Sequence, residues 1–310
     1  MLSRLNTLTQ KYFSLILILA SVAAMFIPEP DPGSARWLLV LLAVIIFASF
    51  FRVSLGDGKL ATLMPQAIVY VILRFLILPL AVFVLVLPFS SFYAFCLAFL
   101  FLMPAAVASP TYVSLFGISV NMPVLVLVFS SFLSIITIPL LTPLLFHGQV
   151  HISSWPLLKA VLLTILLPFL LHLPVRKVPK ISRVISENLS LITSVSLVIM
   201  LLIAISLNRK LILADPAEVL IDFILGTVAY MLMFFSGWLM GFKRGIDYKI
   251  SNSISSGMNN IGLGISLSIL YLKPEVSVFL IMAEFVWVFI LLPVRLMFQK
   301  VHRTESGLKE

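Results

Sequence analysis

The sequence predicts an all-α membrane protein of ten transmembrane helices, from its composition, the length of its apolar runs and the placement of its charges. Of the 310 residues, 61% are apolar and 11% are charged, and the mean hydropathy is +1.18. Soluble domains average about 45–50% apolar and about 25% charged residues. Hydrocarbon requires the backbone to satisfy its own polar groups, which helices and closed barrels achieve. The apolar runs are long and do not alternate, which favours helices.

A bilayer core of about 30 Å is crossed by roughly 20 apolar residues. The spans predicted by this measure cover residues 12–28, 36–53, 66–87, 91–116, 122–146, 155–173, 189–207, 217–240, 250–272 and 275–299. Sorting the 21 Lys and Arg residues onto alternate sides puts fifteen beside the two termini and five opposite, with Arg74 inside a span. The positive-inside rule therefore predicts a multi-pass protein of the cell (inner) membrane with both termini in the cytoplasm.

The net charge of +9 does not indicate nucleic-acid binding, because the basic residues lie in short clusters between apolar runs. The single cysteine, Cys96, excludes an intramolecular disulfide. The spans show no paired catalytic groups and no cluster of metal ligands, so we expect no enzymatic activity, no cofactor and no resident metal. The expected partners are a small organic anion and the lipid bilayer.

Two stretches about half a chain apart share one spacing, in which a polar residue is followed by two prolines. They are Ser109, Pro123 and Pro143, in steps of 14 and 20 residues, and Asn260, Pro274 and Pro293, in steps of 14 and 19. Since each half of the chain holds five spans, the second copy enters the membrane in the opposite sense. We therefore predict two inverted repeats, residues 1–148 with spans 1–5 and residues 149–310 with spans 6–10. The alternative is a chance spacing of prolines, which are common in membrane helices.

Spans 4 and 9 are predicted to be discontinuous. In span 4, Pro104 and Pro110 remove backbone donors, while Ser109 and Pro110 are favoured at the start of a new helix. In span 9, residues 253–262 form the most polar run in any span. Restarting half-helices suit an anion, whereas unwound carbonyls and hydroxyls suit a small cation. The alternative is that Ser and Asn only tie neighbouring helices together.

At these residues the chain resembles the bile acid:sodium symporter family, whose members have ten spans in two inverted repeats with discontinuous crossover helices 4 and 9. The matching residues are Ala108 and Ser109, residues 140–143 (Leu-Leu-Thr-Pro), residues 257–260 (Gly-Met-Asn-Asn), and Gly262 and Leu263. The resemblance implies a core domain from spans 3–5 and 8–10 and a panel domain from spans 1–2 and 6–7, with substrate carried between them.

The resemblance also implies site residues. The ion site, or its surrogate, would include Arg74, Ser109, Ser130, Ser131, Ser134, Ser255, Ser256, Met258 and Asn259. The substrate would contact Ser109, Pro110, Asn259 and Asn260. The family has an acidic residue in place of Ser255, an Asn in place of Pro110 and a neutral glutamine near Arg74. Losing a carboxylate and gaining a guanidinium both oppose cation binding.

Two charged residues within the spans carry the coupling hypotheses. Arg74 lies about eight residues into an apolar span, where insertion costs on the order of 3 kcal/mol. Its guanidinium either takes the place of a sodium ion, which would make the carrier sodium-independent, or forms an ion pair with Glu284 of span 10. Glu284 is a candidate partner for Arg74, a candidate proton acceptor or a surrogate ion ligand, and the ion pair is the preferred interpretation.

The leading functional interpretation is a secondary carrier of a small organic anion that works by alternating access, with sodium as a candidate coupling ion at a degenerate site. One alternative is a sodium-independent or proton-coupled exporter of a sibling family, either auxin-carrier-like or an arsenite exporter. Arsenite is disfavoured because Cys96 lies 13 residues before Ser109, away from the predicted break. Another alternative is a channel, which would need polar groups along a pore rather than at one depth.

Overall fold

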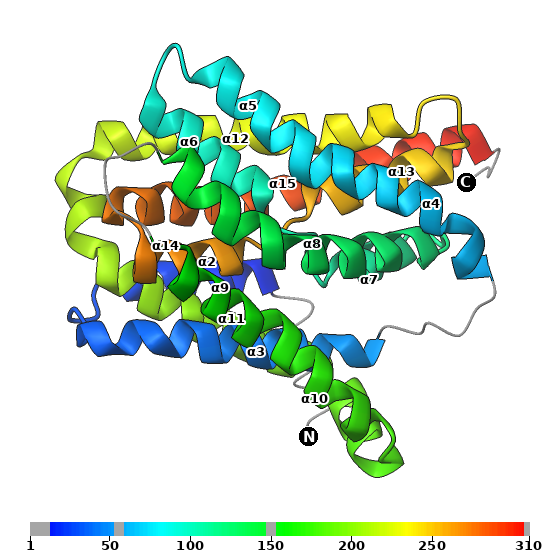
Figure 1. Ribbon diagram of the computed structural model, residues 1–310, viewed down its shortest axis with the longest axis horizontal. Helices are drawn as coiled ribbons and strands as arrows, with labels where there is room; N and C mark the ends of the chain where they lie inside the picture. Colours follow the sequence, from blue (N-terminus) through cyan, green and yellow to red (C-terminus); the bar gives the residue numbers. More distant parts are fainter. Residues whose placement is uncertain (1–12, 53–58, 147–152, 307–310) are drawn as a thin grey trace.

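The computed structural model describes residues 13–52, 59–146 and 153–306, and these residues form helices joined by short connections (Figure 1). The predicted start of span 1 at residue 12, and both termini assigned to the cytoplasm, lie outside these ranges. In chain order the α-helices are α2 (Phe13–Ala24), α3 (Arg36–Ser49), α4 (Lys59–Ile72), α5 (Leu78–Val86), α6 (Ser91–Leu102), α7 (Ser109–Ser114), α8 (Asn121–Leu145), α9 (Ser154–Val161), α10 (Leu167–Arg176), α11 (Pro179–Ala214), α12 (Pro216–Met240), α13 (Ile246–Gly257), α14 (Ile261–Tyr271) and α15 (Pro274–Ser306).

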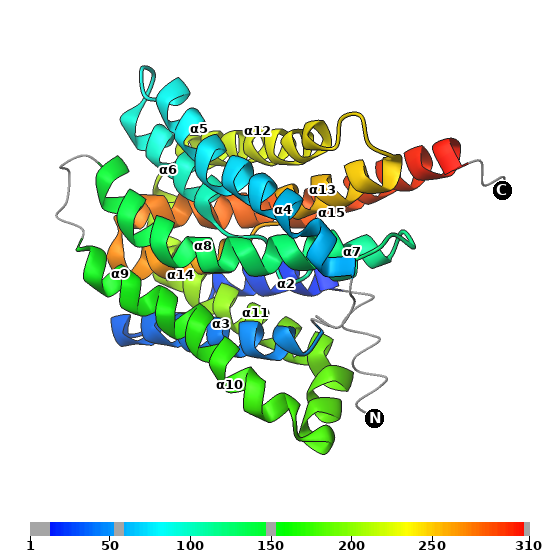
Figure 2. The ribbon, with the colours of Figure 1, turned by 45° about the vertical axis from the view of Figure 1, so that its right-hand side comes forward.

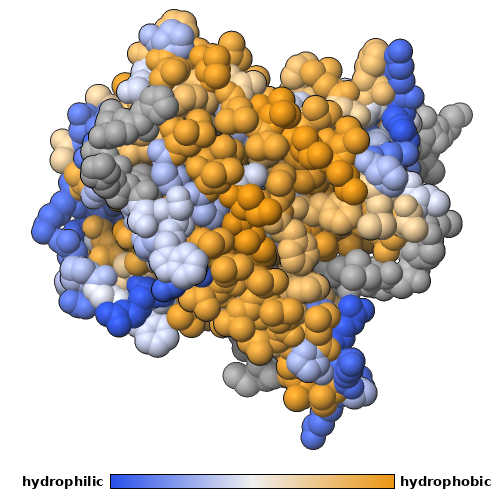
Figure 3. Space-filling model, in the orientation of Figure 1, coloured by the Kyte–Doolittle hydropathy of each residue, from blue (hydrophilic) through white to orange (hydrophobic). Residues whose placement is uncertain are grey.

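Seven helical stretches in the described residues are long and apolar enough to cross a membrane. They are Pro32–Ser49, Leu60–Val86, Asn121–Leu145, Ser154–Arg176, Pro179–Ala214, Pro216–Met240 and Pro274–His302. Shorter apolar helices stand where spans 1, 4 and 9 are predicted. Polar residues gather at two opposite ends of the molecule and leave a broad apolar band between them (Figure 3). The predicted all-α class is therefore confirmed, and the apolar band has the character of a surface that faces lipid.

Two of the long stretches contain a π-helical segment. Segment η3 (Leu73–Ile77) joins α4 to α5, and η4 (Leu162–Leu166) joins α9 to α10. Each segment is followed by a Leu-Pro pair, which ends in Pro79 or Pro168. Proline has no N–H to donate to the preceding turn, so the helix widens locally instead of keeping a regular ladder. The first of these segments places Arg74 in the interior of the molecule.

The helices form two groups that lie side by side. Helix α11 packs on α2 and α3 in one group, and α12 packs on α13 and α15 in the other. Figures 1 and 2 show α3, α10 and α11 on one side, and α4, α5, α12 and α13 on the other. Helix α14 contacts α3 and α11, so it reaches from the second group to the first.

Two interruptions fall inside the predicted spans 4 and 9, at residues 103–108 and 258–260, and they lie against each other. Ala105 and Asn259 form an antiparallel bridge. The amide of Ala106 donates to the Met258 carbonyl at 2.7 Å, and the amide of Asn260 donates to the Pro104 carbonyl at 2.7 Å. The half-helices α6 and α7 run opposite to α13 and α14 along the long axis (Figure 1). Each break therefore satisfies backbone groups that the other leaves without a helical partner.

Two details of the predicted breaks are wrong. Ala108, rather than Ser109, is the residue that precedes α7, and no side chain caps that helix. The second break is three residues long, because Ser255 and Ser256 remain inside α13. The Ser255 hydroxyl donates to the Ser251 carbonyl of its own helix at 2.9 Å. Serine hydroxyls can bond helix carbonyls in this way, so a serine-rich run need not end a helix.

Candidate functional site

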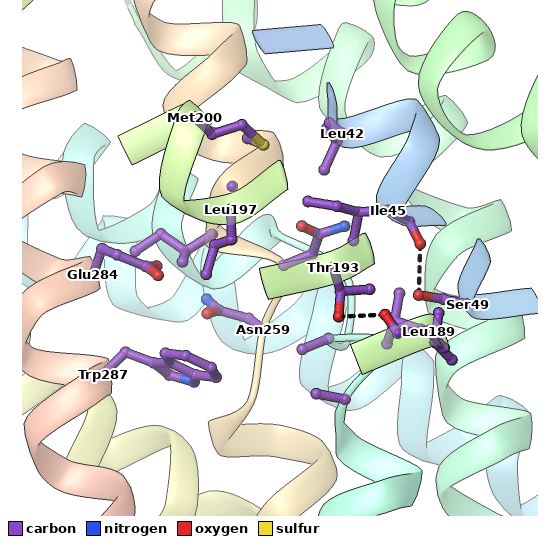
Figure 4. A pocket seen from close by; sticks show the side chains of 16 residues that line it. Leu42, Ile45, Ser49, Leu189, Thr193, Leu197, Met200, Asn259, Glu284 and Trp287 are labelled. Carbon is purple, nitrogen blue, oxygen red and sulfur yellow. Dashed lines mark hydrogen bonds between the residues drawn. The ribbon is translucent and has the colours of Figure 1, made fainter. Parts of the chain in front are cut away.

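A cavity of about 170 Å³ lies where the two breaks face α3, α11 and α15 (Figure 4). Apolar side chains form most of its wall, and a few polar groups enter it from several elements. The lining residues are Leu42, Ile45 and Ser49 of α3, Ala106, Val107 and Ala108 of the first break, Leu189, Thr193, Leu197 and Met200 of α11, Asn259, Asn260, Ile261 and Gly262 around the second break, and Glu284 and Trp287 of α15. An apolar pocket with few polar groups is typical of a site for a small organic molecule.

Three of the predicted site residues line this cavity, namely Asn259, Asn260 and Glu284. The Asn259 Nδ2 donates to the Leu100 carbonyl at 2.9 Å, and its Oδ1 accepts from the Tyr230 hydroxyl at 3.0 Å. Asn259 therefore ties α6 and α12 to the second break and has its side chain held in one orientation.

Asn260 is the N-cap of α14. Its Oδ1 accepts from the Leu263 amide at 3.3 Å, which satisfies one free donor of the first helical turn. Because Ile261 and Gly262 also line the cavity, the N-terminus of α14 opens onto it. The partial positive charge of a helix N-terminus is therefore directed at the cavity.

Arg74 is 0% exposed, and its guanidinium bonds three oxygen atoms of other helices. Nε donates to Ser256 Oγ at 2.6 Å, Nη2 to the Ser256 carbonyl at 2.8 Å and Nη1 to the Phe101 carbonyl at 3.0 Å. The guanidinium also lies over the rings of Phe75 and Phe101, 4.7 and 5.2 Å from their centroids. These contacts join η3 to the last residues of α6 and α13, just before each break.

The preferred interpretation of an Arg74–Glu284 ion pair is wrong. Among the described residues, neither side chain takes part in an ion pair, and Glu284 lines the cavity whereas Arg74 does not. Tyr230 of α12 lies in the electrostatic range of both side chains. The two charges are separate because the carbonyls near the breaks provide a closer set of acceptors for the guanidinium.

Of the predicted residues at the end of α13, Ser256 is the one that hydrogen-bonds Arg74 among the described residues. The Ser256 Oγ accepts from Arg74, donates to the Met233 carbonyl at 2.6 Å and lies 3.1 Å from Ser236 Oγ. Ser255 is bonded within its own helix. The Met258 carbonyl accepts from the first break. Ser256 therefore acts both as a tie between helices and as part of the environment of the guanidinium.

The predicted hydroxyls of α8 have unequal surroundings. Ser130 Oγ accepts from the Ala105 amide at 3.0 Å and so supports the first break. Ser131 and Ser134 donate to carbonyls of their own helix, Leu127 at 2.7 Å and Ser131 at 2.7 Å. Of the three, Ser130 is the one with a contact outside α8.

Ser109 and Pro110, predicted as substrate contacts, do not line the cavity. Ser109 is 0% exposed and its hydroxyl has no hydrogen-bond partner within the described residues. Both residues are at the start of α7, directly after the first break. The first break therefore presents Ala106, Val107 and Ala108 to the cavity instead.

Sequence reasoning missed Trp287, Tyr230 and Thr193. Trp287 lines the cavity three residues after Glu284, a spacing that puts both on one face of α15. That spacing is a readable signal, although a tryptophan in a membrane helix is more often a packing residue. Tyr230 and Thr193 are recognised only through their positions, because Tyr230 stands between apolar residues and Thr193 is one of several hydroxyl residues in its stretch of α11.

The apolar helices define a multi-pass membrane protein, and a mostly apolar cavity lies at its two helix breaks. The family model described as Sodium Bile acid symporter family matches residues 39–215, which is more than half of the chain. The chain belongs to this family, whose members are membrane transporters rather than enzymes. The match includes the first break and ends before the second. No curated protein matches the chain.

Proposed function

We propose that this protein is a secondary active transporter of a small organic anion. The observation that carries the proposal is the N-terminus of α14, with its cap Asn260, opening onto a mostly apolar cavity. Amide N–H groups and partial positive charge attract an anion, and apolar walls attract the organic part of the molecule. Ile261 and Gly262 supply first-turn amides at the cavity wall.

The proposed mechanism is alternating access between two helix groups, a core from spans 3–5 and 8–10 and a panel from spans 1–2 and 6–7. The cavity supports this division, since α3 and α11 form one wall while the breaks and α15 form the other. The antiparallel pairing of Ala105 with Asn259 supports a ten-span plan of two inverted repeats, in which spans 4 and 9 are the broken helices. We place the protein in the cell (inner) membrane with both termini in the cytoplasm.

We further propose that Arg74 replaces a coupling sodium ion. Its guanidinium donates to two backbone carbonyls and one hydroxyl next to the breaks, which are the oxygen ligands that a small cation would take. A permanent charge at this place leaves no free ligand for sodium. The other predicted ligands that bond their own helices, Ser131, Ser134 and Ser255, have no role in this arrangement.

The anion proposal is tested by the thermal stability of the purified protein with a panel of carboxylates and sulfonates. A ligand that binds the native state at about a hundred times its Kd stabilises by about 2.7 kcal/mol. We expect at least one organic anion to raise Tm, with equal effect in sodium and potassium salts. If no anion in the panel shifts Tm while organic cations do, the proposal is contradicted.

The Arg74 proposal is tested by Arg74→Gln. Removing the guanidinium frees the Phe101 and Ser256 carbonyls, so we expect sodium chloride to raise the Tm of this variant more than potassium chloride does. The wild type should show no difference between the two salts. Arg244→Gln, which changes an exposed arginine, is the matched control. A variant that is indifferent to sodium would contradict the role of Arg74 as a built-in cation.

A further inference from the structure

We propose that Glu284 carries a proton together with the transported anion, so that the protein is a proton–anion symporter. This inference rests on the proposed function, and it names the coupling ion. It starts from two unpaired polar groups on one face of α15. Glu284 is 4% exposed and Trp287 is 8% exposed. In the part of the chain that the structure describes, Glu284 Oε2 and Trp287 Nε1 have no hydrogen-bond partner.

Both groups are directed into the cavity. Figure 4 shows the Glu284 carboxyl and the Trp287 ring pointing from α15 towards the space beside Asn259. Glu284 and Gly262 together line this cavity and a smaller one next to it. Hydrogen bonds in the described residues account for the amide of Leu263 but not for those of Ile261 and Gly262. Unpaired donors from α14 and α15 therefore face the same cavity as the carboxyl group.

The groups packed around Glu284 do not neutralise a negative charge. Leu197 and Met200 face it from α11, and Gly262 and Ile265 from α14. Tyr230 of α12 is a titratable group within electrostatic range of Glu284, and the tyrosine hydroxyl already donates to Asn259. The Arg74 guanidinium is bonded to two carbonyls and the Ser256 hydroxyl. A buried carboxyl without a cation is far less costly when it is protonated.

The coupling follows from electrostatics. An anion at the N-terminus of α14 would lie in the same cavity as the carboxyl group, and two negative charges in a buried, mostly apolar pocket repel strongly. The anion therefore binds well only when Glu284 holds a proton. By linkage, binding of the anion raises the proton affinity of Glu284 by the same factor. Both ligands then move together when the cavity changes sides, and the pocket holds one negative charge instead of two.

The test uses two sulfonates, taurocholate and 2-naphthalenesulfonate, which stay ionised over the whole pH range used. Their binding to the purified full-length protein is measured from mildly acidic to mildly alkaline pH. Once the carboxyl ionises, the apparent Kd of the wild type should rise by about tenfold per pH unit. Sulfonate binding in weak buffer should also take up protons, approaching one proton per bound anion, as measured with a pH indicator.

Three variants separate the roles of the groups. Glu284→Gln, which mimics the protonated acid, should bind sulfonate with a Kd that does not depend on pH and without proton uptake. Glu275→Gln, an exposed glutamate on the same helix, is the matched control and should behave as the wild type. Trp287→Phe removes one N–H donor, so the Kd should rise by about tenfold at every pH while the pH dependence stays.

Each outcome decides the matter. Sulfonate binding that is independent of pH overturns proton coupling, and proton uptake that persists in Glu284→Gln shows that another group takes up the proton. Either result overturns the proposed role of Glu284 and leaves the anion carrier standing. Binding of tetraethylammonium that tightens as pH rises, with no sulfonate binding at any pH, contradicts both proposals and identifies a cation site. If Glu284→Gln does not elute as a monodisperse species, proton uptake by the wild type still decides whether anion binding and protonation are linked.

Discussion

The two helix breaks lie against each other but contribute different chemistry. The first, residues 103–108, reads Met-Pro-Ala-Ala-Val-Ala and has no side chain with a conventional hydrogen-bonding group. The second, residues 258–260, reads Met-Asn-Asn and carries two amide side chains that bond three different elements. The first break thus provides backbone groups and space at the cavity, while the second provides polar side chains that hold the two breaks together and line the cavity.

The comparison predicts that the largest effect comes from Asn259→Ala. This change removes the Asn259 donor from the Leu100 carbonyl, which keeps a long bond of 3.4 Å from the Met103 amide, and leaves the Tyr230 hydroxyl without its acceptor. Interhelical hydrogen bonds in membranes average about 0.6 kcal/mol, but the loss of two such bonds with one buried group left unpaired should raise the cost to about 2 kcal/mol. The loss is measured as a fall in Tm of the purified protein.

Asn208→Ala is the control for this change. Asn208 is also buried, but its amide donates to the Ala204 carbonyl of its own helix. We expect it to cost about 1 kcal/mol or less, because that carbonyl keeps its helical hydrogen bond. Equal losses in the two variants would show that the second break does not depend on Asn259.

An intermediate effect is expected from Asn260→Ala, which removes the cap of α14. Loss of an N-cap costs about 1 kcal/mol, and the first turn of α14 should become less ordered. Asn260→Ser keeps a capping oxygen and should restore most of the stability. Hydrogen exchange at the amide of Leu263 measures the effect locally. That amide also donates to the backbone carbonyl of residue 260 at 3.1 Å, which the alanine variant keeps, so protection should fall but not vanish. Protection equal to that of the wild type would contradict the capping role.

The smallest effect, with the opposite sign, is expected from Ser109→Ala. The hydroxyl of Ser109 is buried and has no hydrogen-bond partner within the described residues. Its removal should leave the free energy of unfolding unchanged or raise it by up to about 1 kcal/mol, with no fall in Tm. Ser130→Ala is the same chemical change at a hydroxyl that accepts from Ala105, and it should lower the stability by about 1 kcal/mol. A larger loss of stability in Ser109→Ala than in Ser130→Ala would contradict the interpretation that Ser130, and not Ser109, supports the first break.

Sequence reasoning located both breaks but misjudged how each is made. Pro104 predicted the position of the first break correctly, because proline lacks the backbone N–H that would bond a carbonyl one turn earlier in the same helix. The serine-rich run before Gly257 was wrongly predicted to belong to the second break. Whether a serine ends a helix depends on which carbonyl its hydroxyl bonds. Ser255 found one in its own helix, and Ser256 found one in α12.

The residues of the candidate site were predictable only in part. Asn259, Asn260 and Glu284 were recognisable because polar groups in an apolar span require a partner or a role. The partner of Arg74 was not recognisable, because the Phe101 and Ser256 carbonyls are backbone atoms that any residue would supply. Ser109 was chosen by position, but the first break contributes Ala106, Val107 and Ala108 to the cavity wall and Ser109 is not part of it.

The sequence by itself determined the helical class, the membrane environment and the places where spans 4 and 9 are interrupted. Each of these follows from hydropathy or backbone chemistry within a few turns. Only the tertiary structure decided that the breaks pair with each other, that Arg74 bonds carbonyls instead of Glu284, and that Trp287 shares the cavity with Glu284. Those outcomes join residues up to about 180 positions apart, and their energies depend on which buried groups meet in space.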